Sequence, residues 1–178
     1  MEKNVPFLRL AASEEVALLA DIQLKAAIRF PDDVLPEPMR SAYTVSGEIM
    51  TEALEKGRLW VACGKENALL GYAVWRDMDG AAVLEQVDVL PQHGRRGIGS
   101  LLVRHIMEQA AGAGHLDLYL TTFKNVPWNA PFYLKLGFTI AEDDRLPQPV
   151  LKIIRQEREA IKNRIAMQRD LSDLILSV

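Results

Sequence analysis

A glycine-rich turn between residues 94 and 100 carries the residues best suited to chemistry in this chain. Gly94, Gly97 and Gly99 let the backbone bend tightly and bring its N–H groups close to a ligand. The turn opens a helix, whose unpaired first amides and positive dipole end favour an anion. Two neighbouring arginines add charge, and a guanidinium matches the geometry of a phosphate. We therefore expect a polyphosphorylated ligand to bind here.

The turn lies inside a strand–helix–strand unit. Residues 82–90 have a strand pattern, residues 98–111 form an amphipathic helix, and residues 116–121 form a second strand. Such a crossover makes its two strands parallel. Strands at 58–63 and 69–76 precede the unit and are joined by short turns, which predicts an antiparallel meander with residues 82–90.

The remaining pattern predicts an α/β fold with a mixed, mostly antiparallel sheet. Ser13 is expected to cap the first helix. One unbroken helix over residues 148–171 remains an alternative to a helix followed by a strand. The other expected elements are a strand at 5–10, helices at 13–29, 46–56, 129–136 and 148–162, and strands at 138–141 and 164–171.

Composition limits the functional classes. A length of 178 residues favours one domain, and 49% apolar with 25% charged residues is ordinary for a soluble protein. A net charge of −3 argues against a global basic face for nucleic acid. Cys63 is the only cysteine, which fits a reducing cytosol and a buried strand thiol. No apolar run reaches the ~18 residues of a membrane span. We therefore expect a cytoplasmic enzyme or binding domain.

Two common phosphate-binding motifs are absent from the turn. A dinucleotide fingerprint that begins at Gly97 needs a glycine at position 102, where the chain has Leu102. A Walker loop needs Gly-Lys-Ser/Thr, but Gly99 is followed by Ser-Leu.

The segment resembles the coenzyme A signature of the GNAT superfamily of N-acetyltransferases, in particular a bacterial branch of it. The signature has a valine two residues before a proline, then Gln/Arg-x-x-Gly-x-Gly/Ala, and Val89, Pro91, Gly97 and Gly99 match it. A second match is Asn-Ala-Pro-Phe-Tyr-Leu-Lys-Leu-Gly-Phe at residues 129–138, close to the family's Phe-Tyr-x-x-x-Gly-Phe ending.

The resemblance spans residues 5–141 and implies one N-acetyltransferase domain over residues 1–178, with a C-terminal helix, final strand and tail in 145–178. It implies a GNAT-like sheet of about seven strands, with a splayed parallel pair in its middle and helices on both faces. The cosubstrate would be acetyl-CoA, without a metal. The acceptor would be a primary amine of a small molecule or peptide that attacks directly in a ternary complex. Neither nucleic acid nor a membrane is implied, and the apolar tail at 171–178 is compatible with a homodimer.

The resemblance also implies which residues bind the coenzyme. Backbone amides would hold the diphosphate, and the free edge of strand 82–90 would bind the pantetheine arm. Gly94 stands where the family usually has Gln or Arg, but backbone amides do most of the binding, so we expect binding to survive. The implied set is Val87, Asp88, Val89, Gly94, Arg95, Arg96, Gly97, Ile98, Gly99, Ser100, Asn129, Phe132 and Tyr133.

Acyl transfer to an amine needs a base, an oxyanion donor and an acid for the leaving thiolate. Glu85 shares strand parity with Val87 and Val89 and is the candidate base, directly or through water. The alternative role for Glu85 is a structural hydrogen bond. The resemblance assigns the oxyanion to the Val89 N–H. Asp88 has the opposite parity and is expected to be structural.

Tyr133 is the candidate general acid toward the coenzyme sulfur, by resemblance. A Phe132–Tyr133 pair on a short helix is otherwise an ordinary core feature. Asn129 lies one helical turn before Tyr133 and either contacts the coenzyme or caps the helix.

The acceptor is less constrained than the coenzyme. The loop after the first helix carries Asp32, Asp33 and Glu37, which would attract a cationic amine or form an ordinary solvated loop. The alternative function is a catalytically silent acyl-CoA sensor or interaction module on the same fold.

Overall fold

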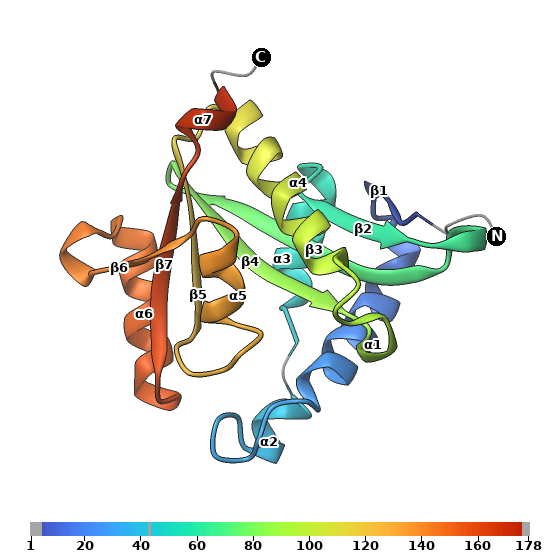
Figure 1. Ribbon diagram of the computed structural model, residues 1–178, viewed down its shortest axis with the longest axis horizontal. Helices are drawn as coiled ribbons and strands as arrows, with labels where there is room; N and C mark the ends of the chain where they lie inside the picture. The colour runs from blue at the N-terminus through green and yellow to red at the C-terminus, as the bar shows by residue number, and fades with distance from the viewer. Residues whose placement is uncertain (1–4, 43, 176–178) are drawn as a thin grey trace. The chain divides into compact units, whose positions relative to one another are not determined.

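The computed structural model describes residues 5–42 and 44–175. Its strands form a mixed sheet in the order β1–β2–β3–β4–β5–β7–β6 (Figure 1). β4 and β5 are parallel, with Ala82 opposite Leu118 and Val83 opposite Tyr119. The expected α/β fold with one parallel pair in a mostly antiparallel sheet is confirmed. The strands are β1 Phe7–Leu10, β2 Leu59–Cys63, β3 Leu69–Met78, β4 Ala81–Val89, β5 Asp117–Phe123, β6 Thr139–Ala141 and β7 Arg164–Asp170.

Helices join these strands close to the expected positions. Two short helices, α2 and α7, were not expected from the apolar pattern. Within the described ranges, no helix combines the length and hydropathy that a membrane crossing needs. The helices are α1 Val16–Ala27, α2 Glu37–Arg40, α3 Gly47–Glu55, α4 Ile98–Gly112, α5 Ala130–Lys135, α6 Gln148–Ala160 and α7 Ser172–Ile175.

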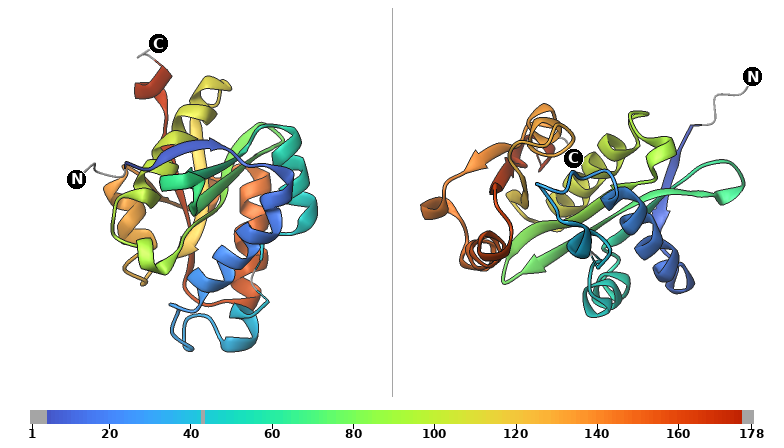
Figure 2. Two further views of the ribbon diagram at one scale, coloured as in Figure 1. Left: turned by 90° about the vertical axis from the view of Figure 1, so that its right-hand side faces the viewer. Right: turned by 90° about the horizontal axis from the view of Figure 1, so that it is seen from below.

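The chain divides into two compact units, of which the first comprises residues 1–75 and 86–103. In this unit α1 and α3 pack on β2 and β3 (Figure 2). Burial of these apolar side chains is the main force that holds the helices to the strands. Cys63 is fully buried in this core, as expected. The core consists of Leu19, Ile22, Met50, Ala53, Leu59, Val61, Cys63, Tyr72 and Val74.

The second unit comprises residues 76–85 and 104–178. Its core lies between α6 and the strands β4, β5, β6 and β7. Val150, Leu151 and Ile154 form the buried stripe of α6, because residues one helical turn apart share a face. Ala81 and Val83 contribute from β4.

The first helix does not start as expected. Residues Ser13–Glu15 form a 3₁₀ turn, and the Ser13 hydroxyl points to Glu14. The Glu15 carboxylate accepts the Ala12 N–H at 2.8 Å and is bound by Arg9 at 2.7 Å. The Ser13 cap is therefore wrong, because a carboxylate that Arg9 orients makes stronger, charge-assisted bonds than a hydroxyl does.

The end of the chain forms a helix and then a strand. α6 stops at Ala160, the backbone turns at Asn163 with φ 60°, and β7 pairs with β5 on one side and β6 on the other. The alternative of one unbroken helix over residues 148–171 is therefore wrong. Residues 176–178 of the apolar tail lie outside the described residues.

Candidate functional site

The glycine-rich turn follows β4 in the first unit. A 3₁₀ turn at Pro91–His93 leads into it, and α4 begins at Ile98. Gly97 has φ +81°, a conformation that glycine adopts without strain, and a Cβ atom placed there would meet nothing within 4 Å. The first amides of α4 are those that a helix leaves without internal partners. Open space thus adjoins a set of N–H donors.

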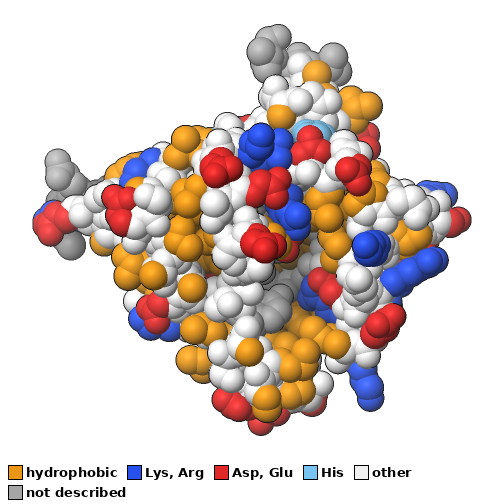
Figure 3. All heavy atoms as spheres, turned by 180° about the vertical axis from the view of Figure 1, so that it is seen from behind, with side chains coloured by type: hydrophobic (Ala, Val, Ile, Leu, Met, Phe, Trp, Pro, Cys, Tyr) orange, Lys and Arg blue, Asp and Glu red, His pale blue; other side chains and the backbone are white. Residues whose placement is uncertain are grey.

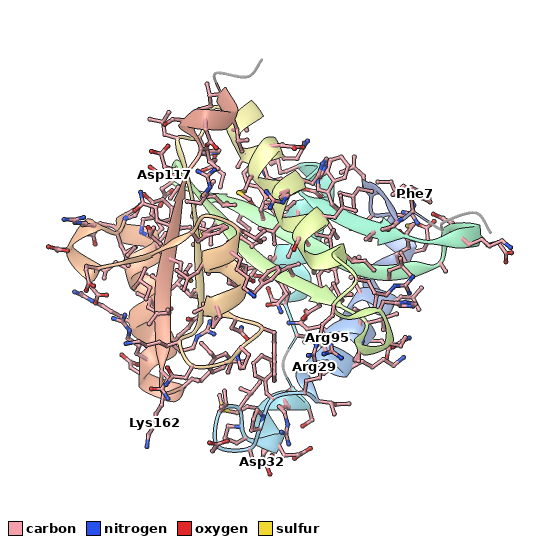
Figure 4. All side chains as sticks on the ribbon, in the orientation of Figure 1. Phe7, Arg29, Asp32, Arg95, Asp117 and Lys162 are labelled. Carbon is pink, nitrogen blue, oxygen red and sulfur yellow. The ribbon has the colours of Figure 1, made fainter. Side chains whose placement is uncertain are left out.

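Positive charge gathers at this turn. Arg95 and Arg96 are exposed, and Arg96 Nη1 lies 3.0 Å from His93 Nδ1. Arg29, just after α1, places Nη1 3.7 Å from the position of a Cβ atom on Gly94. Figure 4 shows Arg29 and Arg95 together beside the turn. Sequence reasoning missed Arg29, because nothing in its local pattern distinguishes it from other helix-end arginines.

The strand before the turn is held closely by β3. The Leu90 N–H donates to Leu70 O at 2.9 Å. A Cβ atom on Gly71 would lie 2.5 Å from Asp88 O and 3.0 Å from Val89 Cα. Only glycine therefore fits at Gly71 without moving the segment expected to bind the coenzyme.

The Asp88 side chain has two polar neighbours in the same unit. Its Oδ2 accepts a hydrogen bond from Gln86 Nε2 at 2.8 Å, and its carboxyl also bonds to the Tyr72 hydroxyl. Burial raises the pKa of Asp88 to about 7, although both hydrogen bonds favour the ionised form. A carboxyl that titrates near neutrality is a candidate functional group.

Glu85 lies in the second unit. Its Oε2 is 3.5 Å from Arg76 Nη1. Burial raises the pKa of Glu85, Arg76 lowers it, and the nearby Glu157 raises it. The carboxyl is therefore more basic than an exposed glutamate, which suits a group that accepts a proton near neutral pH.

Asn129 does not cap α5 with its side chain. Its Nδ2 donates to Thr122 Oγ1 at 2.8 Å, while its backbone oxygen accepts the Tyr133 N–H at 3.1 Å. Asn129 therefore occupies the N-cap position of α5, as one alternative expected, but without a capping hydrogen bond from its side chain. Asn129 Oδ1 is buried and has no hydrogen-bond partner among the described residues, so it can accept a bond from a ligand.

Tyr133 is 9% exposed and lies in a small aromatic cluster. Its ring meets those of Phe132 and Phe138 edge-on, with centroids 5.0 and 5.6 Å away. Edge-to-face packing of this kind fixes the direction of the ring. The cluster thus orients the Tyr133 side chain.

The expected site residues fall into two groups, which we describe separately. The second unit holds Glu85, Asn129, Phe132 and Tyr133. The first unit holds Val87, Asp88, Val89, Gly94, Arg95, Arg96, Gly97, Ile98, Gly99 and Ser100.

The acidic loop after α1 is partly neutralised. Arg40 binds both Asp32 and the carbonyl oxygen of Phe30. This pairing weakens the attraction that Asp32 would exert on a cationic amine. Acidic and basic side chains are also interspersed over the face in Figure 3.

The comparison with known families decides what the turn belongs to. A family model described as the acetyltransferase (GNAT) family matches residues 26–138. The chain belongs to the acetyltransferase (GNAT) family. The match includes β4, the glycine-rich turn, α4 and α5, so both motifs noted in the sequence lie within it.

Individual GNAT proteins are similar over different parts of the chain. Streptothricin acetyltransferase from Streptomyces lavendulae is 38% identical over 88 residues, 46% of this chain and 44% of that protein. N-acetylglutamate synthase from Neisseria gonorrhoeae, solved with coenzyme A and N-acetyl-glutamate, has a TM-score of 0.74 at 19% identity and covers 96% of this chain and 36% of its own. The match to each of these two spans less than half of the relative's length.

A third relative is similar over its whole length. The PaiA N-acetyltransferase from Thermoplasma acidophilum, solved with coenzyme A, has a TM-score of 0.68 at 15% identity, covering 93% of this chain and 99% of its own. At these identities the solved structures show the fold alone. They confirm that this GNAT chain has the fold expected from its sequence.

Proposed function

We propose that this protein is an N-acetyltransferase that moves an acetyl group from acetyl-CoA to a primary amine of a small molecule or peptide. The observation that carries the proposal is the turn of this GNAT chain, where open space at Gly97 adjoins the first amides of α4. Relatives solved with coenzyme A support the choice of cosubstrate.

Coenzyme binding is assigned to the following groups. The amides from Arg95 to Ser100 hold the diphosphate, as anions bind helix N-termini. Arg29, which lies beside Gly94, donates a charge-assisted hydrogen bond to the diphosphate. The Asn129 Oδ1 atom accepts a hydrogen bond from the pantetheine arm, which gives a buried acceptor the partner it needs.

The chemistry proceeds by direct attack. Glu85 takes the proton of the acceptor ammonium, directly or through water, and the freed amine nitrogen bonds to the thioester carbonyl carbon. The Val89 N–H stabilises the oxyanion that forms. The C–S bond then breaks, and the leaving thiolate takes the proton of the Tyr133 hydroxyl. The tyrosinate is neutralised by the proton that the amide nitrogen loses, relayed through solvent, and Glu85 releases the proton that it took to solvent.

Two measurements test this proposal. Calorimetry with acetyl-CoA measures binding, and release of free thiol with a panel of amines and peptides measures transfer. Binding with amine-dependent thiol release is the expected result. Binding without release across the panel would instead indicate an acyl-CoA sensor, and no binding would refute the proposal.

A pair of glycine substitutions tests the position of the diphosphate. Gly97 and Gly114 both have positive φ and open space around a Cβ atom, so Gly97→Trp and Gly114→Trp carry similar backbone strain. We expect Gly97→Trp to abolish acetyl-CoA binding and Gly114→Trp to leave it unchanged. Equal affinities in the two variants would contradict the assignment.

A further inference from the structure

Glu85 and Arg76 form an ion pair between the neighbouring strands β4 and β3, within the second unit. Ala81 and Val83 of β4 belong to the core that α6 covers, and Glu85 is two residues further along, so its side chain lies on the same face. Met78 of β3 packs against this core, which places Arg76 on that face by the same alternation. Arg76 Nη1 lies 3.5 Å from Glu85 Oε2, and each side chain is 24% exposed. The pair is therefore partly withdrawn from water, where opposite charges attract more strongly than at the surface.

The two oxygens of the Glu85 carboxylate differ in their surroundings. Oε2 faces Arg76, whereas Oε1 has no hydrogen-bond partner among residues 5–42 and 44–175. An ionised carboxylate has lone pairs on both oxygens. The contact at Oε2 therefore orients the group and leaves Oε1 to accept a proton from an amine or a water molecule.

A second carboxyl, that of Glu157 on α6, has its own partners. Its Oε1 accepts the Thr121 hydroxyl at 2.9 Å, and its Oε2 accepts Arg164 Nε at 2.9 Å. Arg164, which comes from β7, thereby balances the charge of Glu157. Arg76 is paired with Glu85 instead. The two carboxyls and the two guanidiniums thus form separate pairs.

The neighbouring charges act on the Glu85 proton in opposite directions. Burial raises the pKa of Glu85, Arg76 lowers it by its charge and its hydrogen bond, and Glu157 raises it. On β5, the face toward α6 carries Thr121, which does not titrate, and Tyr119, whose phenol stays neutral because burial raises its pKa. Of these groups, Arg76 is the one that bonds to Glu85 and favours its ionised form.

We propose that Arg76 is a positioning residue for acyl transfer, which anchors Oε2 of Glu85 and keeps this carboxylate charged, so that Oε1 can take the proton of the acceptor ammonium. Without the guanidinium, a larger share of Glu85 is protonated near neutral pH, and the remaining carboxylate loses its fixed direction. The inference rests on the proposed function, because it assumes that Glu85 is the base. The proton that Glu85 accepts goes to solvent after the transfer.

The first test needs no turnover. The ¹³C chemical shift of the Glu85 carboxyl is followed from about pH 3 to about pH 9, and the signal is assigned by its loss in Glu85→Gln. We expect the midpoint to lie at a higher pH in Arg76→Gln than in the wild type, and to return toward the wild-type value in Arg76→Lys, which restores the charge. The control Arg158→Gln removes a guanidinium that is paired with Asp143 in the same unit, and it should leave the midpoint unchanged. A wild-type midpoint in Arg76→Gln would overturn the proposal.

The ion pair can also be followed from the Arg76 side, in protein that keeps both partners. In the wild type, the ¹³Cζ chemical shift of Arg76 should change at the same midpoint as the Glu85 carboxyl, and in Glu85→Gln that change should disappear. An Arg76 signal that does not follow Glu85 would contradict the pairing. Both measurements hold whether or not acetyl-CoA binds, so they are independent of the proposed function.

The second test connects the pair to the reaction through the pH dependence of kcat/KM for an accepted amine. In Arg76→Gln we expect kcat/KM to fall about fivefold more at about pH 6 than at about pH 9, because less Glu85 is ionised at the lower pH. Arg76→Lys should recover most of this difference, and the profile of Arg158→Gln should match that of the wild type. A loss of equal size at both pH values would show a structural effect alone and refute the positioning role.

The two tests separate the inference from the function on which it rests. A wild type that binds acetyl-CoA but acetylates no amine refutes the proposed function, and the positioning role falls with it. An active wild type in which Arg76→Gln moves the Glu85 titration but not the rate profile overturns the positioning role alone. Acetyl transfer would then stand, with a base other than Glu85.

Discussion

Gly71 and Asp88 lie in backbone contact across β3 and β4, and a Cβ atom on Gly71 would be 2.5 Å from Asp88 O. Real Cβ atoms do not approach an oxygen so closely, so any larger residue must move one of the strands. The contact fixes the segment from Asp88 to Val89, on which the proposed oxyanion donor and coenzyme edge depend.

Gly71→Ala should therefore impair both folding and coenzyme binding. We expect the free energy of unfolding to fall by about 1–3 kcal/mol, the usual cost of overpacking, and Kd for acetyl-CoA to rise. Gly47→Ala is the matched control, because a Cβ atom there meets nothing within 4 Å. Urea unfolding and calorimetry measure the two effects. If Gly71→Ala had the wild-type free energy of unfolding and the wild-type Kd for acetyl-CoA, β4 would be shown to tolerate displacement.

Asp88 should make stability depend on pH. Its pKa is about 7 in the folded protein against an ordinary value of 3.8, so the folded state holds a proton that the unfolded state loses between these values. Stability from this group is therefore lost as pH rises from about 4 to about 7. Asp88→Asn removes the loss, and we expect it to be more stable than wild type above pH 7 by roughly 2–4 kcal/mol.

Thermal unfolding at low and high pH measures the Asp88 effect. Asp21→Asn, which alters an exposed ion pair with Lys25, is the control and should show little change at either pH. A Tm difference between Asp88→Asn and wild type that does not grow with pH would contradict the raised pKa.

Arg29 should contribute to coenzyme affinity. Arg29→Ala removes a guanidinium beside the turn, and we expect Kd for coenzyme A to rise about three- to tenfold, as for one charge-assisted hydrogen bond. Lys25→Ala, one turn earlier on α1 and paired with Asp21, should leave Kd unchanged. Calorimetry at two salt concentrations should also show a weaker salt dependence in Arg29→Ala. The same Kd in both variants would exclude Arg29 from the site.

Arg164 holds a buried polar cluster in the second unit. It is 7% exposed, its Nε donates to Glu157 Oε2 at 2.9 Å, and its Nη2 donates to Thr121 Oγ1 at 3.0 Å. Arg164→Met leaves Glu157 without this cation, so we expect a loss of about 2–4 kcal/mol in urea unfolding. Arg158→Met breaks the more exposed pair with Asp143 and should cost less than about 1 kcal/mol. Equal losses would show that burial adds nothing to the Arg164 cluster.

Tyr133→Phe tests the proposed acid. Removal of the hydroxyl should lower kcat by about 100-fold, because the thiolate then leaves unprotonated. Kd for coenzyme A should stay near wild type, since the ring packing on Phe132 and Phe138 is kept. Tyr119→Phe makes the same change in the second core and should leave kcat unaltered. An unchanged kcat for Tyr133→Phe would move the role of acid to another group.

Local pattern was enough to place most of the fold. Gly112 ends α4, and the apolar stripe of α6 followed by the alternation of β7 gave the right order of elements. The prediction that Ser13 caps the first helix was wrong, although the sequence around Ser13 is typical of a helix cap. Arg9 is outside that local window, and its bond to Glu15 decided the start of α1.

The candidate site was predictable where it is local in sequence. The spacing of the glycines alone predicted the turn at Gly94, Gly97 and Gly99. Arg29 and Tyr72 could not be assigned in this way, because each meets its partner across a long separation in the chain. The strand parity of Asp88 indicated a structural role, but only the fold shows that Gln86 and Tyr72 are its partners.

The strand order at one end of the sheet has a consequence for biosynthesis. β7 lies between β5 and β6, although β6 is made first. β6 can therefore pair with β7 only after residues 164–170 have left the ribosome. Until then the backbone groups of β6 that later bond to β7 are hydrogen-bonded to water. Closure of this edge depends on the last strand to be translated, so a chain cut before residue 164 would leave β5 and β6 open to pairing with other molecules.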